Sequence, residues 1–161
     1  MEIERKWIIK ELPKDYTLSS PILYERHFIF NQDDIEIRIQ RKGNRYELER
    51  KVKQSQLSRD TMKVEITENE YNRLKELSVS SISRESYMIA KYPEISIKRY
   101  LDRCDGLIRV EIEFDSEDQA INFKPYDWFG EEITNSVLGR DSELIKLSEL
   151  EFKQELIKYL M

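Results

Sequence analysis

Two pairs of glutamates stand at alternate positions in segments where charged and apolar residues take turns. Glu2 and Glu4 open the chain, with Lys6 at the same spacing, and Glu111 and Glu113 recur late in the chain. Side chains at i and i+2 of a β-strand share one face, so each pair can present two carboxylates together. Such oxygens can hold a hard divalent cation. The two pairs could converge across a tunnel, or they could form ordinary ion pairs between strands.

Alternation of this kind runs through most of the chain, and a period of two residues predicts β-strands. It occurs in six segments: residues 2–7, 35–40, 46–53, 62–66, 95–98 and 108–114. Two further strands are expected at residues 23–30 and 82–89, and Lys42-Gly43-Asn44 has the composition of a tight turn. The charged faces mix acids with bases, among them Arg38, Lys51, Lys63, Lys98 and Arg109.

The mixed charge on so many strand faces has two interpretations. In one, a sheet covers a core with its apolar face and turns its polar face to water. In the other, eight strands close into a barrel whose interior holds side chains or one small ligand. A barrel lined by Arg, Lys and Glu needs charged contents, because unpaired buried charge is costly. A polyphosphate with a bound cation would satisfy that need, with the bases on phosphate oxygens.

Helices are expected between and after the strands. Thr67 or Asn69 can cap a helix that continues to Leu77, and Ser116 can start a short one. The apolar spacing after Ser142 predicts an amphipathic C-terminal helix with one break. The predicted class is α+β, an eight-stranded antiparallel β-barrel with helices packed outside.

Length and composition narrow the classes of protein further. The 161 residues suit a single domain spanning 1–161, and 39% of them are hydrophobic and 37% charged. A net charge of -5 argues against a basic surface for nucleic acid. One cysteine, Cys104, cannot form an internal disulfide, and a cytoplasmic location is expected. We expect no membrane span and no secretory leader, given the charged start and the lack of a long apolar run.

Several motifs resemble those of the CYTH superfamily, the triphosphate tunnel metalloenzymes. The first strand carries the Glu-x-Glu-x-Lys pattern as Glu2-Ile3-Glu4-Arg5-Lys6. Ile37 to Gln40, Leu48 to Lys51, and Arg84 with Tyr87 are similar to later strands of the family. The late segment reads Val110-Glu111-Ile112-Glu113-Phe114, and Pro125, Trp128, Gly130 and Glu132-Ile133-Thr134 follow it. The resemblance spans residues 2 to about 144.

The resemblance implies an eight-stranded tunnel that holds a triphosphate with Mg²⁺ or Mn²⁺. It implies metal ligation by Glu2, Glu4, Glu111 and Glu113 and phosphate contacts by Lys6, Arg38, Lys51 and Arg84. Lys63, Lys98 and Arg109 are added as phosphate contacts because they share the charged faces. The expected activity is metal-dependent hydrolysis of a small-molecule triphosphate, inorganic or organic. The alternatives are an adenylyl cyclase of class IV type and a binding module impaired in catalysis. Whether the chain is a monomer or a homodimer stays open.

The sequence also departs from the family's pattern. Thr61 and Lys63 stand where many members have a Glu-x-Glu, with Glu65 nearby, and Lys98 stands where an Asp is common. Gln40 replaces a second Arg, Ser86 an Arg, and Phe28 a Tyr that assists the nucleophile in some triphosphatases. Glu47 and Glu49 could supply the missing carboxylates from a neighbouring strand. These departures bear on the number of metal ions.

Lys6 is the candidate catalytic residue. Nearby cations should lower its pKa and would suit it to act as a general base, although it could equally bind phosphate. His27, the one histidine, alternates with Phe28 and is expected to face outward. Cys104 is expected in a turn and Trp128 in packing, without a chemical role.

Overall fold

The computed structural model describes residues 1–160. Eight strands make up most of it: β1 (Glu2–Ile9), β2 (Ile22–Gln32), β3 (Ile35–Lys42), β4 (Arg45–Lys53), β5 (Ser58–Ile66), β6 (Ser80–Lys91), β7 (Glu94–Tyr100) and β8 (Ile108–Phe114). The helices are α1 (Glu68–Lys75), α2 (Glu117–Asn122), α3 (Asp141–Leu144) and α4 (Glu149–Leu160), with 3-10 turns η1 (Asp102–Cys104) and η2 (Val137–Gly139).

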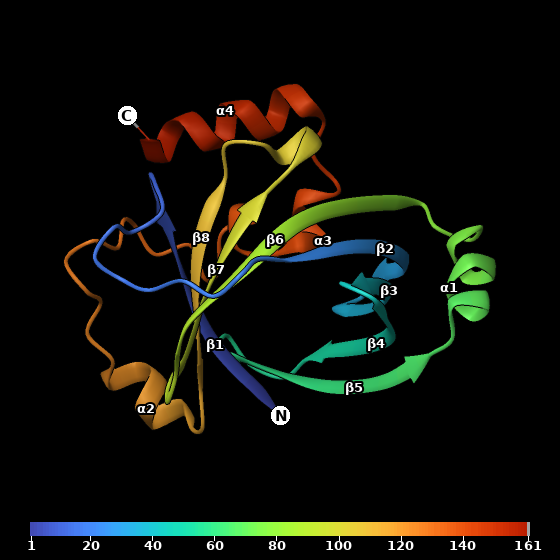
Figure 1. Ribbon diagram of the computed structural model, residues 1–161, viewed down its shortest axis with the longest axis horizontal. Coiled ribbons are helices and arrows are strands. Elements are labelled where there is room, and N and C mark those ends of the chain that lie inside the picture. The colour runs from blue at the N-terminus through green and yellow to red at the C-terminus, as the bar shows by residue number, and fades with distance from the viewer. Residues whose placement is uncertain (161) are drawn as a thin grey trace.

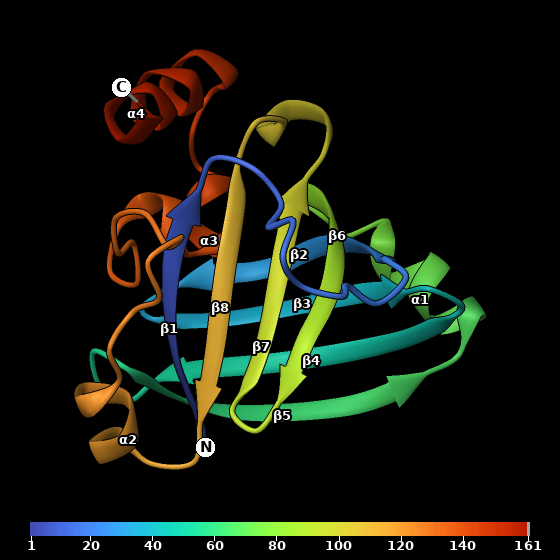
Figure 2. The same cartoon turned by 60° about the vertical axis from the view of Figure 1, so that its left-hand side comes forward.

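The strands close into an antiparallel barrel in the order β1-β5-β4-β3-β2-β6-β7-β8. The predicted fold class is therefore confirmed. Most neighbours pair over long registers, and β1 with β8 runs from Ile3 opposite Phe114 to Ile9 opposite Ile108. The seam between β1 and β5 is much shorter and joins Glu2 to Arg59 and Ile3 to Ser58. Figure 2 shows β1, β8 and β7 crossing the direction of β2 to β5, as in a strongly twisted barrel.

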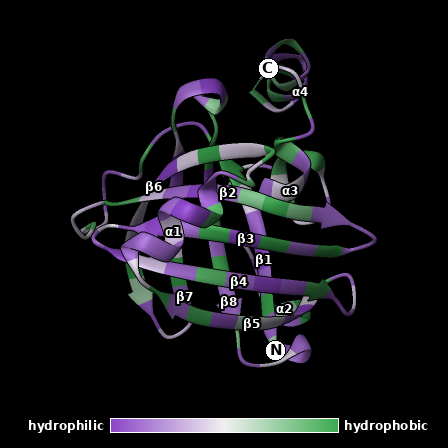
Figure 3. Cartoon of the chain, turned by 90° about the vertical axis from the view of Figure 1, so that its right-hand side faces the viewer, coloured by the Kyte–Doolittle hydropathy of each residue, from purple (hydrophilic) through white to green (hydrophobic). Residues whose placement is uncertain are grey.

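The alternation in the sequence decides which way each side chain points. In β3, β4 and β8 the charged positions turn to the barrel interior and the apolar ones pack outside or at its ends. Figure 3 shows the result as alternating hydrophilic and hydrophobic bands along the strands. The Lys42-Gly43-Asn44 turn joins β3 to β4 as predicted, and Gly43 has a φ of +63°, which a glycine adopts without strain.

Two apolar clusters stabilise the barrel from outside and at one end. The first gathers Phe28, Tyr100, Leu138, Leu144 and Phe152 where α3 and α4 meet the barrel. The second lies under α2 and is built on Trp7, Ile97, Val110, Ile112 and Ala120. In Figure 1, α4 lies across one end of the barrel and α2 lies near the start of β1. Helix α1 lies between the end of β5 and the start of β6.

The first two helices begin where their capping residues predict, and the first ends early, whereas α3 starts at Asp141, one residue before the expected Ser142 boundary. Thr67 caps α1 with a reciprocal capping box to Glu70, and Ser116 caps α2. The predicted extension of α1 to Leu77 is wrong, because the helix stops at Lys75 and Leu77 is exposed. Leu77 is 61% exposed, so another helical turn there would bury little apolar surface. The predicted break in the C-terminal helix lies between α3 and α4.

No helix within residues 1–160 combines the length and the apolar character that a membrane crossing requires.

A charged tunnel as candidate functional site

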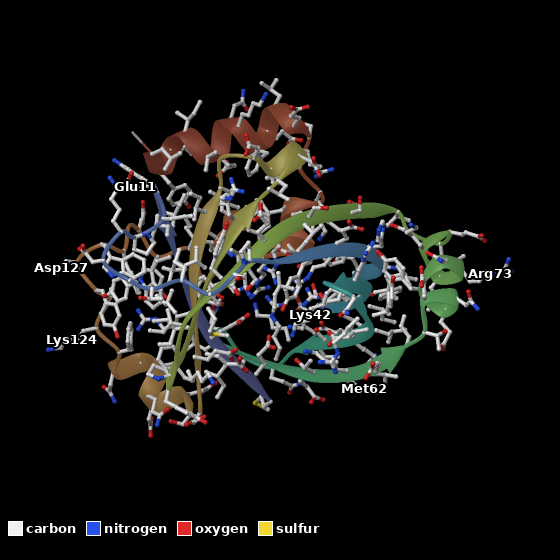
Figure 4. The ribbon with its side chains drawn as sticks, in the orientation of Figure 1. Glu11, Lys42, Met62, Arg73, Lys124 and Asp127 are labelled. Atoms are coloured by element: carbon white, nitrogen blue, oxygen red, sulfur yellow. The ribbon has the colours of Figure 1, made fainter. Side chains whose placement is uncertain are left out.

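The barrel encloses a cavity of about 250 Å³ whose walls are almost entirely polar. Figure 4 looks into it, and Lys42 lies among the nitrogen and oxygen atoms that gather between β2 and β6 on one side and β4 and β5 on the other. Ten lysines and arginines and seven acids line the cavity. Three positive charges are therefore in excess, although the whole chain carries a net charge of -5.

Every site residue predicted from the sequence lies on this wall. They are Glu2, Glu4, Lys6, Arg38, Lys51, Lys63, Arg84, Lys98, Arg109, Glu111 and Glu113. The period of two brings them together, because the same face of each strand turns inward around the barrel. Lys63 is half exposed, which places it near an opening of the tunnel, whereas most of the others are buried.

Three of the four predicted carboxylates, Glu2, Glu4 and Glu111, are already engaged by bases. Glu4 lies 3.2 Å from the Lys6 amine, and Glu2 accepts a hydrogen bond of 2.7 Å from Lys51. The Glu111 carboxylate lies 2.7 Å from Arg109 Nη2. Burial alone would raise the pKa of Glu111, but Arg109 and other nearby bases hold it well below its usual range. Glu111 therefore stays ionised and firmly held in the interior.

A group of acids near Glu113 suits a hard cation. Partial burial, a hydrogen bond with Glu94 and the nearby charges of Glu2 and Glu4 raise the pKa of Glu113 to about 8. A divalent cation would relieve this repulsion, and carboxylate oxygens are ligands that such cations prefer. Among residues 1–160, no three acids, histidines or cysteines already form a cluster that could hold a metal ion. The donor chemistry fits a metal ion, provided that Glu2 and Glu4 turn from their lysines.

The opposite wall is a connected network around Arg38. Its guanidinium lies 3.2 Å from Glu36 and 3.3 Å from Glu49. Gln40 bridges to the same wall, accepting from Arg26 at 2.8 Å and donating to Glu49 at 2.6 Å and to Glu47 at 2.7 Å. Gln40, which stands where the family has a second arginine, thus connects Arg26 to two acids through its amide group. Glu49 lines the cavity, whereas Glu65 is exposed.

Two buried donors on the tunnel wall have no partner. Arg38 Nε and Arg84 Nε make no hydrogen bond with any of residues 1–160, although both residues are almost inaccessible to water. A buried donor without an acceptor costs free energy, so hydrogen bonds from these two donors would stabilise a bound anion.

Two tunnel lysines have a strongly lowered pKa. Burial lowers the pKa of Lys6 to about 8, Arg109 adds to the effect, and Glu4 opposes it. Burial together with Arg84 lowers the pKa of Lys98 to about 7, where its amine donates to Ser86 Oγ at 2.7 Å. The expected fall for Lys6 is confirmed, and desolvation is its largest cause.

Asp141 is a central site residue that the sequence did not reveal. Its carboxylate lies 2.7 Å from Arg26, 3.3 Å from Arg109 and 3.5 Å from Arg84, and it accepts from the Tyr100 hydroxyl. Burial would raise its pKa, but the three arginines hold it well below the usual range. Asp141 starts α3 in an irregular segment, so no periodicity pointed to it. Arg26 shares one face of β2 with Tyr24 and Phe28, and that spacing of two residues could have identified it.

The remaining candidates lie away from the charged wall. His27 faces outward against Tyr71 of α1, as predicted. Phe28 is fully buried in the apolar cluster at the end of the barrel. Tyr87 bonds to Glu85, and neither lines the tunnel. Cys104 lies in η1, buried in the same cluster as Phe28.

Comparison with known proteins agrees with the fold. No model of a known protein family matches the chain. An inorganic triphosphatase of Nitrosomonas europaea is 29% identical over 136 residues, which cover 83% of this chain and 89% of that protein. An inorganic triphosphatase of Acetivibrio thermocellus is 27% identical over 157 residues, covering 95% and 98%. The crystal structure of the inorganic triphosphatase NE1496 superimposes with a TM-score of 0.66 at 24% identity, covering 92% of this chain and 96% of that one. The closed eight-stranded barrel, its inward-facing acids and bases and these relatives support the resemblance to the CYTH superfamily of triphosphate tunnel proteins.

Proposed function

We propose that this protein hydrolyses a triphosphate, of which inorganic tripolyphosphate is the first candidate, inside the tunnel and with a divalent metal ion. The observation that carries the proposal is the excess of three positive charges in an enclosed cavity. Buried cations without a counter-charge cost folding free energy, and a multiply charged anion that binds the folded protein offsets that cost. The two relatives named inorganic triphosphatase support the same choice of substrate.

The phosphate oxygens would be held by bases from several strands. Arg38 and Arg84 each offer a free Nε donor, and Lys98 points an amine into the cavity. Lys51 and Arg109 add charge from β4 and β8, and Lys63 would draw the anion toward the opening. Charge-assisted contacts in a partly dehydrated site would neutralise the phosphoryl group in the transition state and align it for attack.

The metal ion, Mg²⁺ or Mn²⁺, would be held by Glu2, Glu4 and Glu113, with Glu111 on the same wall. When bound, it would neutralise charge on the phosphate oxygens and so polarise the terminal phosphorus. The acids around Glu113 support this assignment by their mutual repulsion. Turning to the metal would separate Glu2 from Lys51 and Glu4 from Lys6 and free both amines for phosphate.

Lys6 is the residue we place nearest to the chemistry. Its amine lies between Glu4 and the carbonyl oxygen of Gly139, which it reaches at 2.9 Å. From there it would contact the phosphate directly or take a proton from the attacking water. The whole chain, residues 1–161, would act as one tunnel domain in this scheme.

The test is phosphate release from tripolyphosphate, ATP and pyrophosphate, each with Mg²⁺, with Mn²⁺ and with excess chelator. We expect orthophosphate from tripolyphosphate, with little release in chelator. Cyclic AMP and pyrophosphate as main products from ATP would instead identify a cyclase. Binding of tripolyphosphate without turnover would identify a binding module.

A pair of lysine variants connects any activity to the tunnel. Lys63→Gln removes a half-exposed charge at the tunnel, and Lys153→Gln removes a similarly exposed one on α4. We expect the first to raise KM for tripolyphosphate and the second to leave it unchanged. Equal effects would mean that the activity depends on overall charge and not on this cavity.

A further inference from the structure

We infer that Asp141 is a chain-length stop, an internal anion that fills one end of the tunnel and rejects polyphosphates longer than a triphosphate. This inference rests on the proposed function and adds a specificity residue to it. It follows from where Asp141 comes from, what surrounds it and which apolar cluster it adjoins.

Asp141 is carried into the barrel by a segment that is held firmly in place. Lys6 donates to the carbonyl oxygen of Gly139 at 2.9 Å, and Arg109 donates to that of Leu138 at 2.9 Å. Gly139 packs so tightly that a Cβ there would lie 1.9 Å from the carbonyl oxygen of Ile133. Bases of the tunnel itself thus hold the segment, and Asp141 has little freedom to withdraw.

The carboxylate of Asp141 occupies a cage that would suit a phosphoryl group. Arg26, Arg84 and Arg109 converge on it within 3.5 Å, and the Tyr100 hydroxyl donates to it. Arginine forks and hydroxyl donors around one anion are the usual chemistry of phosphate recognition. The side chain is 1% exposed and lines the same cavity as the other tunnel residues. The protein therefore supplies its own anion at this end.

Asp141 adjoins an apolar cluster, because its partner Tyr100 and Leu144 of the same helix both belong to that cluster. Phe28, Leu138 and Leu144 are fully buried there and pack with Ile82 and Tyr100. A phosphoryl group could not continue in this direction without entering an apolar core. An added phosphoryl group at this end of a bound chain would therefore have to lie against the Asp141 carboxylate.

Like charges at contact distance in a partly dehydrated site repel strongly. This repulsion acts as specificity by exclusion, since it penalises the longer chain and leaves the shorter one unaffected. A purely structural role would have a different result, because loosening the three arginines would weaken all polyphosphates to a similar degree.

The experiment compares kcat/KM for tripolyphosphate and tetrapolyphosphate in the wild type, Asp141→Asn, Asp141→Glu and Glu36→Gln. Glu36→Gln is the matched control, because Glu36 is also buried and paired with two arginines but does not line this cavity. We expect Asp141→Asn to raise the tetrapolyphosphate-to-tripolyphosphate ratio by about tenfold or more. Glu36→Gln should leave the ratio unchanged.

Asp141→Glu keeps the negative charge that pairs with the arginines and extends the side chain by one methylene. It therefore tests the inference even if Asp141→Asn fails to fold. We expect it to weaken tripolyphosphate relative to pyrophosphate, measured as competitive binding by calorimetry. An unchanged ratio in both Asp141 variants, or wild-type use of tetrapolyphosphate as good as that of tripolyphosphate, would overturn the inference. Absence of any wild-type turnover would instead refute the proposed hydrolysis, and the binding ratios would still decide the role of Asp141.

Discussion

Lys98 should be a residue that lowers the stability of the empty protein. Its pKa falls from 10.5 to about 7, because burial and the neighbouring Arg84 disfavour the charged amine. At 1.36 kcal/mol for each pKa unit, this gap corresponds to about 5 kcal/mol of lost folding free energy in acid and about 4 kcal/mol at pH 7. Replacing Lys98 with Met removes that cost and keeps most of the volume.

The expected net gain is smaller than the full electrostatic cost. Lys98→Met also removes the hydrogen bond to Ser86, which contributes about 1 kcal/mol. We therefore expect the variant to be about 3 kcal/mol more stable than the wild type at pH 7, which corresponds to a rise in Tm of roughly 6–12 °C.

The pH dependence gives the sharper test. The folded pKa of Lys98 lies below the unfolded one, so between pH 7 and 10.5 the unfolded chain binds more protons and stability rises with pH. At pH 9 the cost of Lys98 falls to about 2 kcal/mol, and the advantage of Lys98→Met over the wild type should shrink by about 2 kcal/mol.

Urea unfolding of wild type and variant at pH 7 and pH 9 measures both effects, because other titrating groups cancel in the difference. Lys63→Met, at a half-exposed position, serves as the control and should change stability by less than about 0.5 kcal/mol. A Lys98→Met protein that is no more stable at pH 7, or whose advantage does not narrow at pH 9, would refute the reasoning. Tripolyphosphate should bind the variant more weakly.

Three further results are expected. Arg38→Ala should weaken tripolyphosphate binding by roughly 1.5–3 kcal/mol in calorimetry and lower Tm as well, because Glu36 and Glu49 lose their shared base. Glu113→Gln should raise the concentration of Mg²⁺ or Mn²⁺ needed for half-maximal phosphate release, and activity that persists in excess chelator would reject the metal assignment. Gly139→Ala should cost at least about 3 kcal/mol of unfolding free energy, since its Cβ would collide with the backbone of Ile133; a melt like that of the wild type would contradict the packing described there.

The barrel and most of the tunnel wall could be predicted because both follow from a period of two residues. Arg38, Lys51 and Glu111 are placed by the strand itself, since every second side chain turns the same way. Strand order and closure were supplied by the family resemblance and not by the alternation, which fits an open sheet equally well.

Asp141 could not be predicted because its partners are distant in sequence. It lies 115 residues from Arg26 and 41 from Tyr100, and it is carried by a 3-10 turn and a one-turn helix that have no periodic pattern. The pairing of Glu2 and Glu4 with lysines was equally hidden, because alternation fixes the face of a strand and not the partner across the barrel.

The short seam beside β1 has a consequence for how the chain folds. Only Glu2 and Ile3 pair with β5, whereas most of β1 pairs with β8, and Lys6 bonds to Gly139 across 133 residues. During synthesis β1 is therefore made first, and most of its pairing partners are made only when nearly the whole chain is complete. Long-range closures of this kind slow folding and leave strand edges unpaired in the meantime. Charged residues at alternate positions of β1 keep this unpaired strand from presenting a long apolar edge. The alternation that lines the tunnel should therefore also reduce aggregation of the nascent chain.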